Sequence, residues 1–152
     1  MIVLNDVSMS IESTSNSKGR LKSGHEEKNM KIASTISRYL LGVIFLTFGL
    51  NGFLHFIPMP PPTGIAAQFF GALFVSRLYI VIFLLQIGPA ILLLVNRYVP
   101  LALTILGAVI FNILCFHIFM APAGLPLALF VTIPWILAVS SVWPAFKGIL
   151  QR

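Results

Sequence analysis

The chain has 152 residues and a formal net charge of +6; 58% of the residues are hydrophobic and only 9% are charged. An average soluble domain carries about 25% charged residues, and a core of this size cannot hide so large an apolar surplus. The composition therefore excludes an ordinary soluble globular enzyme and indicates an integral membrane protein.

The first segment, residues 1–31, is predicted to be a disordered polar tail in front of a membrane domain of residues 32–152. It is rich in Ser, Asn, Lys and Glu and has no periodic apolar pattern. Its four acids nearly balance its five basic residues, so it is not a polybasic anchor. Met30, followed by Lys31 and the first hydrophobic run, is an alternative start of the chain.

Four apolar runs follow, and each is long enough to cross a bilayer as a helix. The runs are continuously apolar rather than alternating, which favours helices over a β-barrel. We therefore expect an all-α membrane protein with a bundle of four transmembrane helices. Gly42, Gly49 and Gly52 predict close packing of the first helix against a neighbour. The predicted spans are about 36–56, 78–95, 99–120 and 127–146.

Short segments connect these runs. The proline-rich stretch 58–62 cannot continue the first helix. Residues 65–74 are apolar but too short to cross, and they are expected to form an interfacial or re-entrant helix between helices 1 and 2. Residues 96–97 and the PAGLP stretch 122–126 predict tight hairpins, so neighbouring helices should be antiparallel.

The charges near the span ends predict the orientation. With the N-terminus inside, Arg77 alone lies on the far side among the basic residues that flank the spans. Both termini are therefore predicted to be cytoplasmic, in a bacterial inner membrane.

From Ile32 onward there is no Asp or Glu, which excludes paired-carboxylate hydrolysis and a carboxylate proton relay in the membrane part. Basic residues standing singly do not indicate a nucleic-acid partner.

Polar side chains inside the spans are the candidate ligand-binding residues: Asn51, His55, Gln86, Asn112 and His117. Asn51 and His55 are four residues apart on one face of the first helix. His117 ends the third span on the same side, so the two histidines are expected at one depth. Together with the asparagines they suit the carbonyls of a quinone headgroup. A flat apolar lining is expected from Phe53, Phe56, Phe69, Phe70, Phe116 and Phe119.

A second interpretation of these residues needs no ligand. Polar side chains also hydrogen-bond between membrane helices as packing contacts, and the Gln86 amide can satisfy the Leu85 carbonyl that Pro89 frees. Asn112 and His117 are about 140° apart around their helix, so they cannot both face one small ligand squarely.

Metal and thiol chemistry have weaker sequence indications. Met59 and Met120 lie near the two histidines, a set that suits copper or haem iron, but no carboxylate is present to orient either ring. No metal site is therefore predicted. Cys115 is the only cysteine, which excludes an intrachain disulfide and a paired-cysteine electron relay.

Three stretches carry a family resemblance: RYLLGVIFLTFGLNGFLHFIPMPPP at 38–62, LQIGPAILLLVNRYVPLALTIL at 85–106 and NILCFHIFMAPAG at 112–124. Together they resemble the DoxX family of membrane proteins, over essentially the whole chain from Met30 onward. The resemblance implies four transmembrane helices. It also implies a redox setting, because founding members are associated with thiosulfate:quinone oxidoreductase and others with proteins that manage thiols or oxidative stress.

One departure limits what the resemblance transfers. Many family members have Glu where this chain has Gln86, so proton transfer by a carboxylate is not expected there. The favoured hypothesis is a quinone-associated subunit of a redox complex rather than a stand-alone enzyme. The alternatives are a structural or assembly subunit and a small transporter. The expected partners are the lipid bilayer and either further copies of the chain or other membrane or redox proteins.

Overall fold

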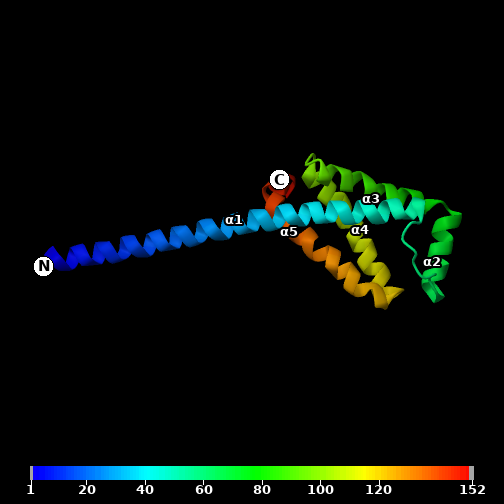
Figure 1. The fold of residues 1–152 in the computed structure, drawn as a ribbon, viewed down its shortest axis with the longest axis horizontal. Helices are drawn as coiled ribbons and strands as arrows, with labels where there is room; N and C mark the ends of the chain where they lie inside the picture. The colour runs from blue at the N-terminus through cyan, green and yellow to red at the C-terminus, as the bar shows by residue number, and fades with distance from the viewer. Residues whose placement is uncertain (1, 151–152) are drawn as a thin grey trace. The chain divides into compact units, whose positions relative to one another are not determined.

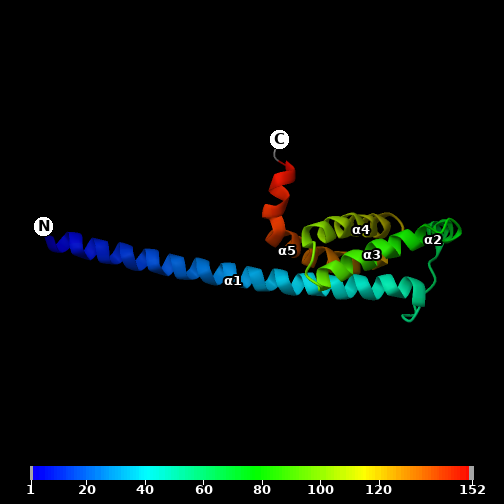
Figure 2. The ribbon, with the colours of Figure 1, turned by 90° about the horizontal axis from the view of Figure 1, so that it is seen from above.

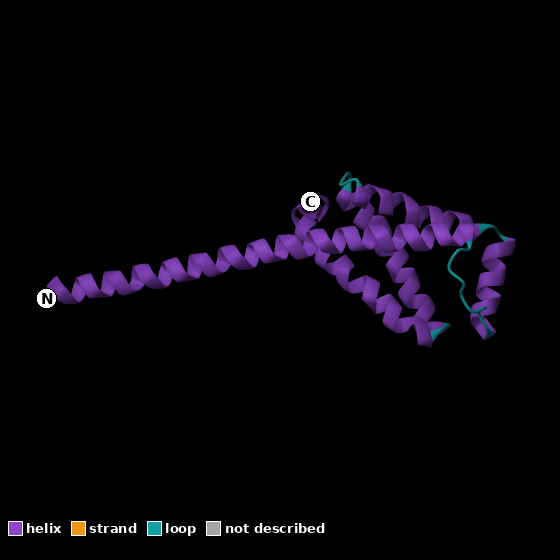
Figure 3. Cartoon of the chain, in the orientation of Figure 1, coloured by secondary structure: helices purple, strands orange, loops and turns teal. Residues whose placement is uncertain are grey.

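The computed structural model describes the backbone of residues 2–150 and the side chains of residue 24 and residues 26–147. This part of the chain consists of helices and connecting loops (Figures 1 and 3). The elements are α1 (Ile2–Leu54), α2 (Gly64–Val75), α3 (Leu78–Leu94), α4 (Val99–Phe119), the 3₁₀ turn η1 (Pro122–Gly124) and α5 (Leu125–Leu150).

Three helical segments are long and apolar enough to cross a membrane: Glu26–Leu54, Val99–Phe119 and Pro122–Lys147. A fourth candidate is the pair α2 and α3, which is bent by 90°. The prediction of an all-helical, multi-pass membrane protein is therefore confirmed. With 17 residues, α3 spans only about 26 Å at 1.5 Å per residue, slightly less than a typical hydrocarbon core.

The N-terminal segment differs from the prediction in its backbone, because α1 begins at Ile2 and not after residue 31. The chain has no proline before Pro58, so no residue removes a helical backbone donor in this stretch. Lys31 and Glu27 form an ion pair of 2.7 Å one turn apart. The chain divides into the units Met1–Ala33 and Ser34–Arg152, close to the predicted boundary at residues 31 and 32.

Within the second unit, α1 packs closely against α3 through its glycines. A Cβ atom added to Gly42 would lie 2.8 Å from Leu94, and one on Gly49 would lie 2.7 Å from Ile87. The residue numbers rise along α1 as they fall along α3, so the two helices are antiparallel, and they lie side by side in both ribbon views (Figures 1 and 2). The predicted packing role of the glycines is confirmed.

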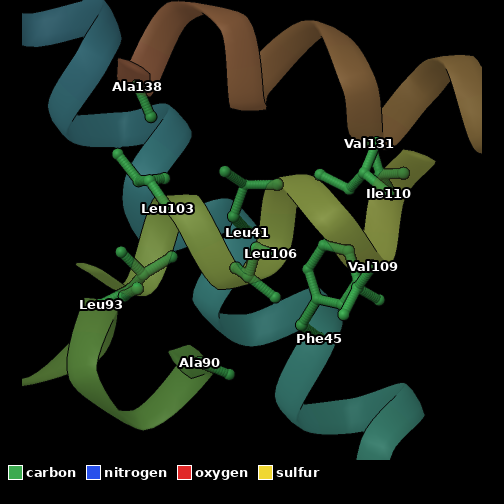
Figure 4. Packing of buried hydrophobic residues seen from close by; sticks show 11 residues of the cluster. Leu41, Phe45, Ala90, Leu93, Leu103, Leu106, Val109, Ile110, Val131 and Ala138 are labelled. Atoms are coloured by element: carbon green, nitrogen blue, oxygen red, sulfur yellow. The ribbon is translucent and has the colours of Figure 1, made fainter. Parts of the chain in front are cut away.

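The apolar core is centred on α4. Leu103 and Leu106 of α4 are fully buried and meet side chains from α1, α3 and α5 (Figure 4). Trp135 of α5 donates its indole N–H to the Leu103 carbonyl at 2.8 Å. The Trp135 ring lies so close to Gly107 that an added Cβ would be 2.7 Å away. A fixed aromatic ring over a glycine therefore holds α5 against α4.

Two turns set the antiparallel order of the last three helices. Between α3 and α4, Asn96 and Tyr98 adopt left-handed backbone angles, with φ of 56° and 52°. Between α4 and α5, η1 takes up the predicted PAGLP hairpin. Near its C-terminal end α5 bends (Figure 2), and Pro144 lies inside this helix. Proline removes a backbone donor and clashes with the preceding turn, which accounts for a bend there.

Candidate functional site

Both membrane histidines lie at the same end of the packed helices. His55 directly follows α1, and His117 lies in the last turn of α4. Because α1 and α4 are each antiparallel to α3, their C-terminal ends lie on the same side. We call this the loop end, since it also carries the proline-rich segment, α2 and η1. The shared depth predicted for the two histidines therefore agrees with the structure.

His117 is the half-buried histidine of this end. Its Nδ1 lies 3.0 Å from the Ala121 carbonyl oxygen, and its ring lies against Gly124. A carbonyl only accepts, so Nδ1 carries a proton and is the donor of this hydrogen bond. Nε2 has no hydrogen-bond partner among the described residues, and in the neutral ring it holds a lone pair. The backbone thus prepares Nε2 to accept a proton or a hydrogen bond.

A series of phenylalanine contacts from two helices leads to His117 through Phe116. The ring centroids of Phe69 and Phe70 on α2 lie 5.7 and 5.3 Å from Phe116 on α4. Phe116 in turn meets the His117 ring edge-on at 5.1 Å. Three of the six predicted lining residues are therefore in one connected group with this histidine, and we call Phe69, Phe70, Phe116 and His117 the aromatic cluster.

The other predicted lining residues lie elsewhere. Phe53 packs edge-on against Phe83 of α3, with ring centroids 5.7 Å apart. Phe56 and Phe119 are exposed. Phe53 and Phe83 belong to a second aromatic series that continues through Tyr79 to Phe74, and this series joins α1, α3 and the end of α2.

His55 is exposed and leaves the helix. Its φ of 53° places it in the left-handed position that commonly ends a helix, and its N–H bonds to the Asn51 carbonyl at 2.9 Å. The imidazole Nδ1 lies 3.1 Å from the Phe53 carbonyl. The predicted alignment of Asn51 and His55 on one helical face is wrong, because the helix stops at Leu54.

Asn51 is only 2% exposed, and its amide is occupied by the loop. Its Oδ1 accepts from the Ile57 N–H at 2.6 Å, and its Nδ2 donates to the Ile57 carbonyl at 3.3 Å. These bonds fold the start of the proline-rich segment back onto the last turns of α1. Asn51 therefore shapes the loop, which agrees with the interpretation of the polar residues as packing contacts.

Gln86 and Asn112 lie apart from the aromatic cluster. Gln86 is 8% exposed, and its Cβ lies 3.2 Å from where a Cβ of Gly49 would be. No hydrogen bond joins its amide to another described residue, so the predicted bond to the Leu85 carbonyl is absent. Asn112 is exposed on α4, whereas His117 is half-buried, which fits their predicted separation around the helix.

Sequence reasoning missed the residues that fix His117. Gly124 provides the space for the ring and Ala121 provides the acceptor. Neither has a functional group, and only the fold of the η1 turn brings them to the histidine. The available indication was that Gly124 lies in the PAGLP stretch and Ala121 directly precedes it, just after a helix with a histidine in its last turn.

Metal ligation has little support in the described side chains. Among them, no three His, Cys, Asp or Glu residues gather to hold an ion. Met59, one of the two methionines considered with the histidines, is exposed on the proline-rich segment.

No family model, curated protein or solved structure matches the chain. Membership of the DoxX family therefore stays a prediction.

Proposed function

We propose that the chain is a four-span membrane protein whose helices form a bundle. The short helix α2 lies at the membrane surface between the first span, α1, and the second span, α3. The support is the packing of α1, α3, α4 and α5 around one core and the sharp bend that separates α2 from α3. The expected orientation has both termini in the cytoplasm of a bacterial cell, because Arg38, Arg97 and Lys147 lie at the opposite end from Arg77.

We propose further that this protein is a redox-linked membrane subunit that binds a quinol headgroup at the aromatic cluster. The observation that carries the proposal is Nε2 of His117, which has no partner among the described residues, next to the Phe116 ring, which itself contacts Phe69 and Phe70 of α2. A quinol presents a hydroxyl donor on a flat ring. Nε2 is the matching acceptor, and Phe69, Phe70 and Phe116 offer apolar faces and edges to such a ring.

The hydrogen bond from His117 Nδ1 to Ala121 favours binding of the quinol over binding of the quinone. A quinone carbonyl accepts hydrogen bonds, and Nε2 of the neutral ring cannot donate one while Nδ1 donates to Ala121. In the proposed complex, Nε2 accepts a hydrogen bond from one hydroxyl of the quinol ring. The other predicted ligands do not contribute, since Asn51 is occupied by Ile57 and Asn112 lies on the outer surface.

The test is binding of decylubiquinol to the purified protein in lipid nanodiscs. The variant His117→Phe should weaken binding about fivefold to tenfold, the effect expected for the loss of one hydrogen bond. His55→Phe is the matched control, because its side chain is exposed at the same end, and it should bind like the wild type. Equal affinity for all three proteins, at unchanged melting temperature, would reject the site.

A second candidate function, that of an assembly subunit, is favoured by Asn112. This side chain is exposed within α4 between Ala108 and Cys115, on a face without a neighbouring helix in the described chain. An amide facing lipid lacks hydrogen-bond partners, whereas a second helix supplies them. Asn112→Leu should then release a co-purifying chain, detected by native mass spectrometry. If Asn112→Leu leaves the complex unchanged, this face is not the assembly surface.

A further inference from the structure

The end opposite to the loop end carries a half-buried arginine, Arg38, and the described side chains of its own unit provide no counter-ion for its charge. Arg38 of α1 donates from Nη1 to the side-chain oxygen of Asn96 in the turn between α3 and α4. Its guanidinium also lies 4.7 Å from the centre of the Tyr39 ring. Both contacts are to neutral groups, and there is no Asp or Glu from Ile32 to the end of the chain.

The hydrogen-bonding capacity of Arg38 is also largely unused. A guanidinium has five N–H donors, and one contact to Asn96 is the hydrogen bond that the structure gives it. Its Nε is shielded from solvent and has no acceptor in the described chain. A buried N–H donor of a charged group that has no acceptor costs free energy. The site therefore lacks one hydrogen-bond acceptor.

A second arginine stands beside it in the turn. Arg97 is exposed and lies between Asn96 and Tyr98, whose left-handed angles fix the course of the backbone. Because Arg38 is bonded to Asn96, the neighbour of Arg97, two guanidinium groups are attached to one short turn. Tyr39 and Tyr98 are both exposed here, as is typical of side chains at the level of lipid headgroups.

We propose that Arg38, Asn96 and Arg97 form a binding site for the phosphate of an anionic lipid headgroup. A phosphate offers several strong acceptors and the missing negative charge, and its geometry suits the planar edge of a guanidinium. Basic sites between helices at a membrane surface recognise lipid headgroups in this way. This site is separate from the aromatic cluster, which lies at the other end of the helices.

The test compares retention of phosphatidylglycerol by the protein after purification from liposomes that contain equal parts phosphatidylglycerol and phosphatidylcholine. Native mass spectrometry counts the bound lipids. Arg38→Gln and Arg97→Gln should each lower the preference for phosphatidylglycerol about fivefold, the value of one basic residue near a membrane surface. Arg77→Gln is the matched control, because it removes the same charge at the loop end, and it should keep the preference.

The outcomes are separable. If the two variants retain phosphatidylglycerol as well as Arg77→Gln does, the site is overturned. If 50 mM inorganic phosphate displaces the lipid, or binds equally well in phosphatidylcholine alone, the site takes a free anion and the lipid assignment is wrong. Should Arg38→Gln fail to fold, the exposed Arg97→Gln still decides the question, and Arg38→Lys should keep part of the preference because it retains charge without the planar edge.

Discussion

Gly124→Ala is the substitution that tests the setting of His117 most directly. A Cβ atom on residue 124 would lie 2.1 Å from Cε1 and 2.3 Å from Nδ1 of the His117 ring, whereas ordinary contact begins at 3.4 Å. The ring therefore has to move by at least about 1.3 Å. If the ring moves by this amount away from the Ala121 carbonyl, which now lies 3.0 Å from Nδ1, the hydrogen bond is lost.

The expected cost of Gly124→Ala is about 1 to 3 kcal/mol, whichever way the strain is relieved. Overpacking a fitted contact costs about that much, and loss of the hydrogen bond alone costs about 0.5 to 1.5 kcal/mol. Gly124 does not need glycine for its backbone, since Gly64 is the glycine with positive φ in the described chain. The penalty therefore arises from the contact with His117.

Two measurements check this prediction. The free energy of unfolding in detergent should fall for Gly124→Ala but not for Gly71→Ala, because nothing lies within 4 Å of a Cβ on Gly71. In ¹⁵N NMR spectra, the imidazole signals of His117 should shift as Nδ1 loses its acceptor. Unchanged stability together with unchanged imidazole signals would show that the ring does not rest on Gly124. Decylubiquinol affinity should also fall in this variant, since Nε2 moves with the ring.

Further predictions concern packing and the tail. Gly107→Ala should destabilise the protein by about 1 to 2 kcal/mol, because its Cβ would lie 2.7 Å from the Trp135 ring. An unchanged melting temperature in thermal unfolding would show instead that the ring moves aside. Asn51→Leu should expose the loop at Ile57 to proteases and cost about 1 to 3 kcal/mol, since it leaves backbone groups without partners; wild-type cleavage rates would contradict this. Deleting residues 1–29 should leave the melting temperature unchanged, because they belong to a separate unit.

The spans were predictable from sequence because each depends on a continuous apolar run, and hydropathy is a local property. The predicted third span, about residues 99–120, agrees with α4 at Val99–Phe119 to within one residue. The glycine packing was also predictable, since close helix contact requires small side chains wherever the helices meet. The length of α1 could not be predicted, because helix formation in a polar segment depends on weak residue propensities rather than on a periodic apolar pattern.

The roles of the polar residues could not be predicted, because each depends on where a neighbouring segment turns. Asn51 was a reasonable ligand candidate on its helix face, yet its partner is Ile57, six residues further on, after the helix has ended. Gln86 lies beside Pro89 as expected, but packing against Gly49 directs its side chain, and its amide does not meet the freed carbonyl. Spacing along a helix predicts which face a residue lies on, and the loops decide what meets that face.

The position of His117 also bears on the missing carboxylate. Position 86 is Gln and no acid follows Ile32, so a proton cannot pass through the middle of the helices by a carboxylate relay. In the proposed function it does not need to. His117 lies in the last turn of α4, next to the hairpin, so a quinol hydroxyl that is bonded to Nε2 is already near the membrane surface. Replacing Gln86 with Glu should therefore leave decylubiquinol affinity unchanged, and a large gain in affinity would place the ligand at the centre of the helices instead.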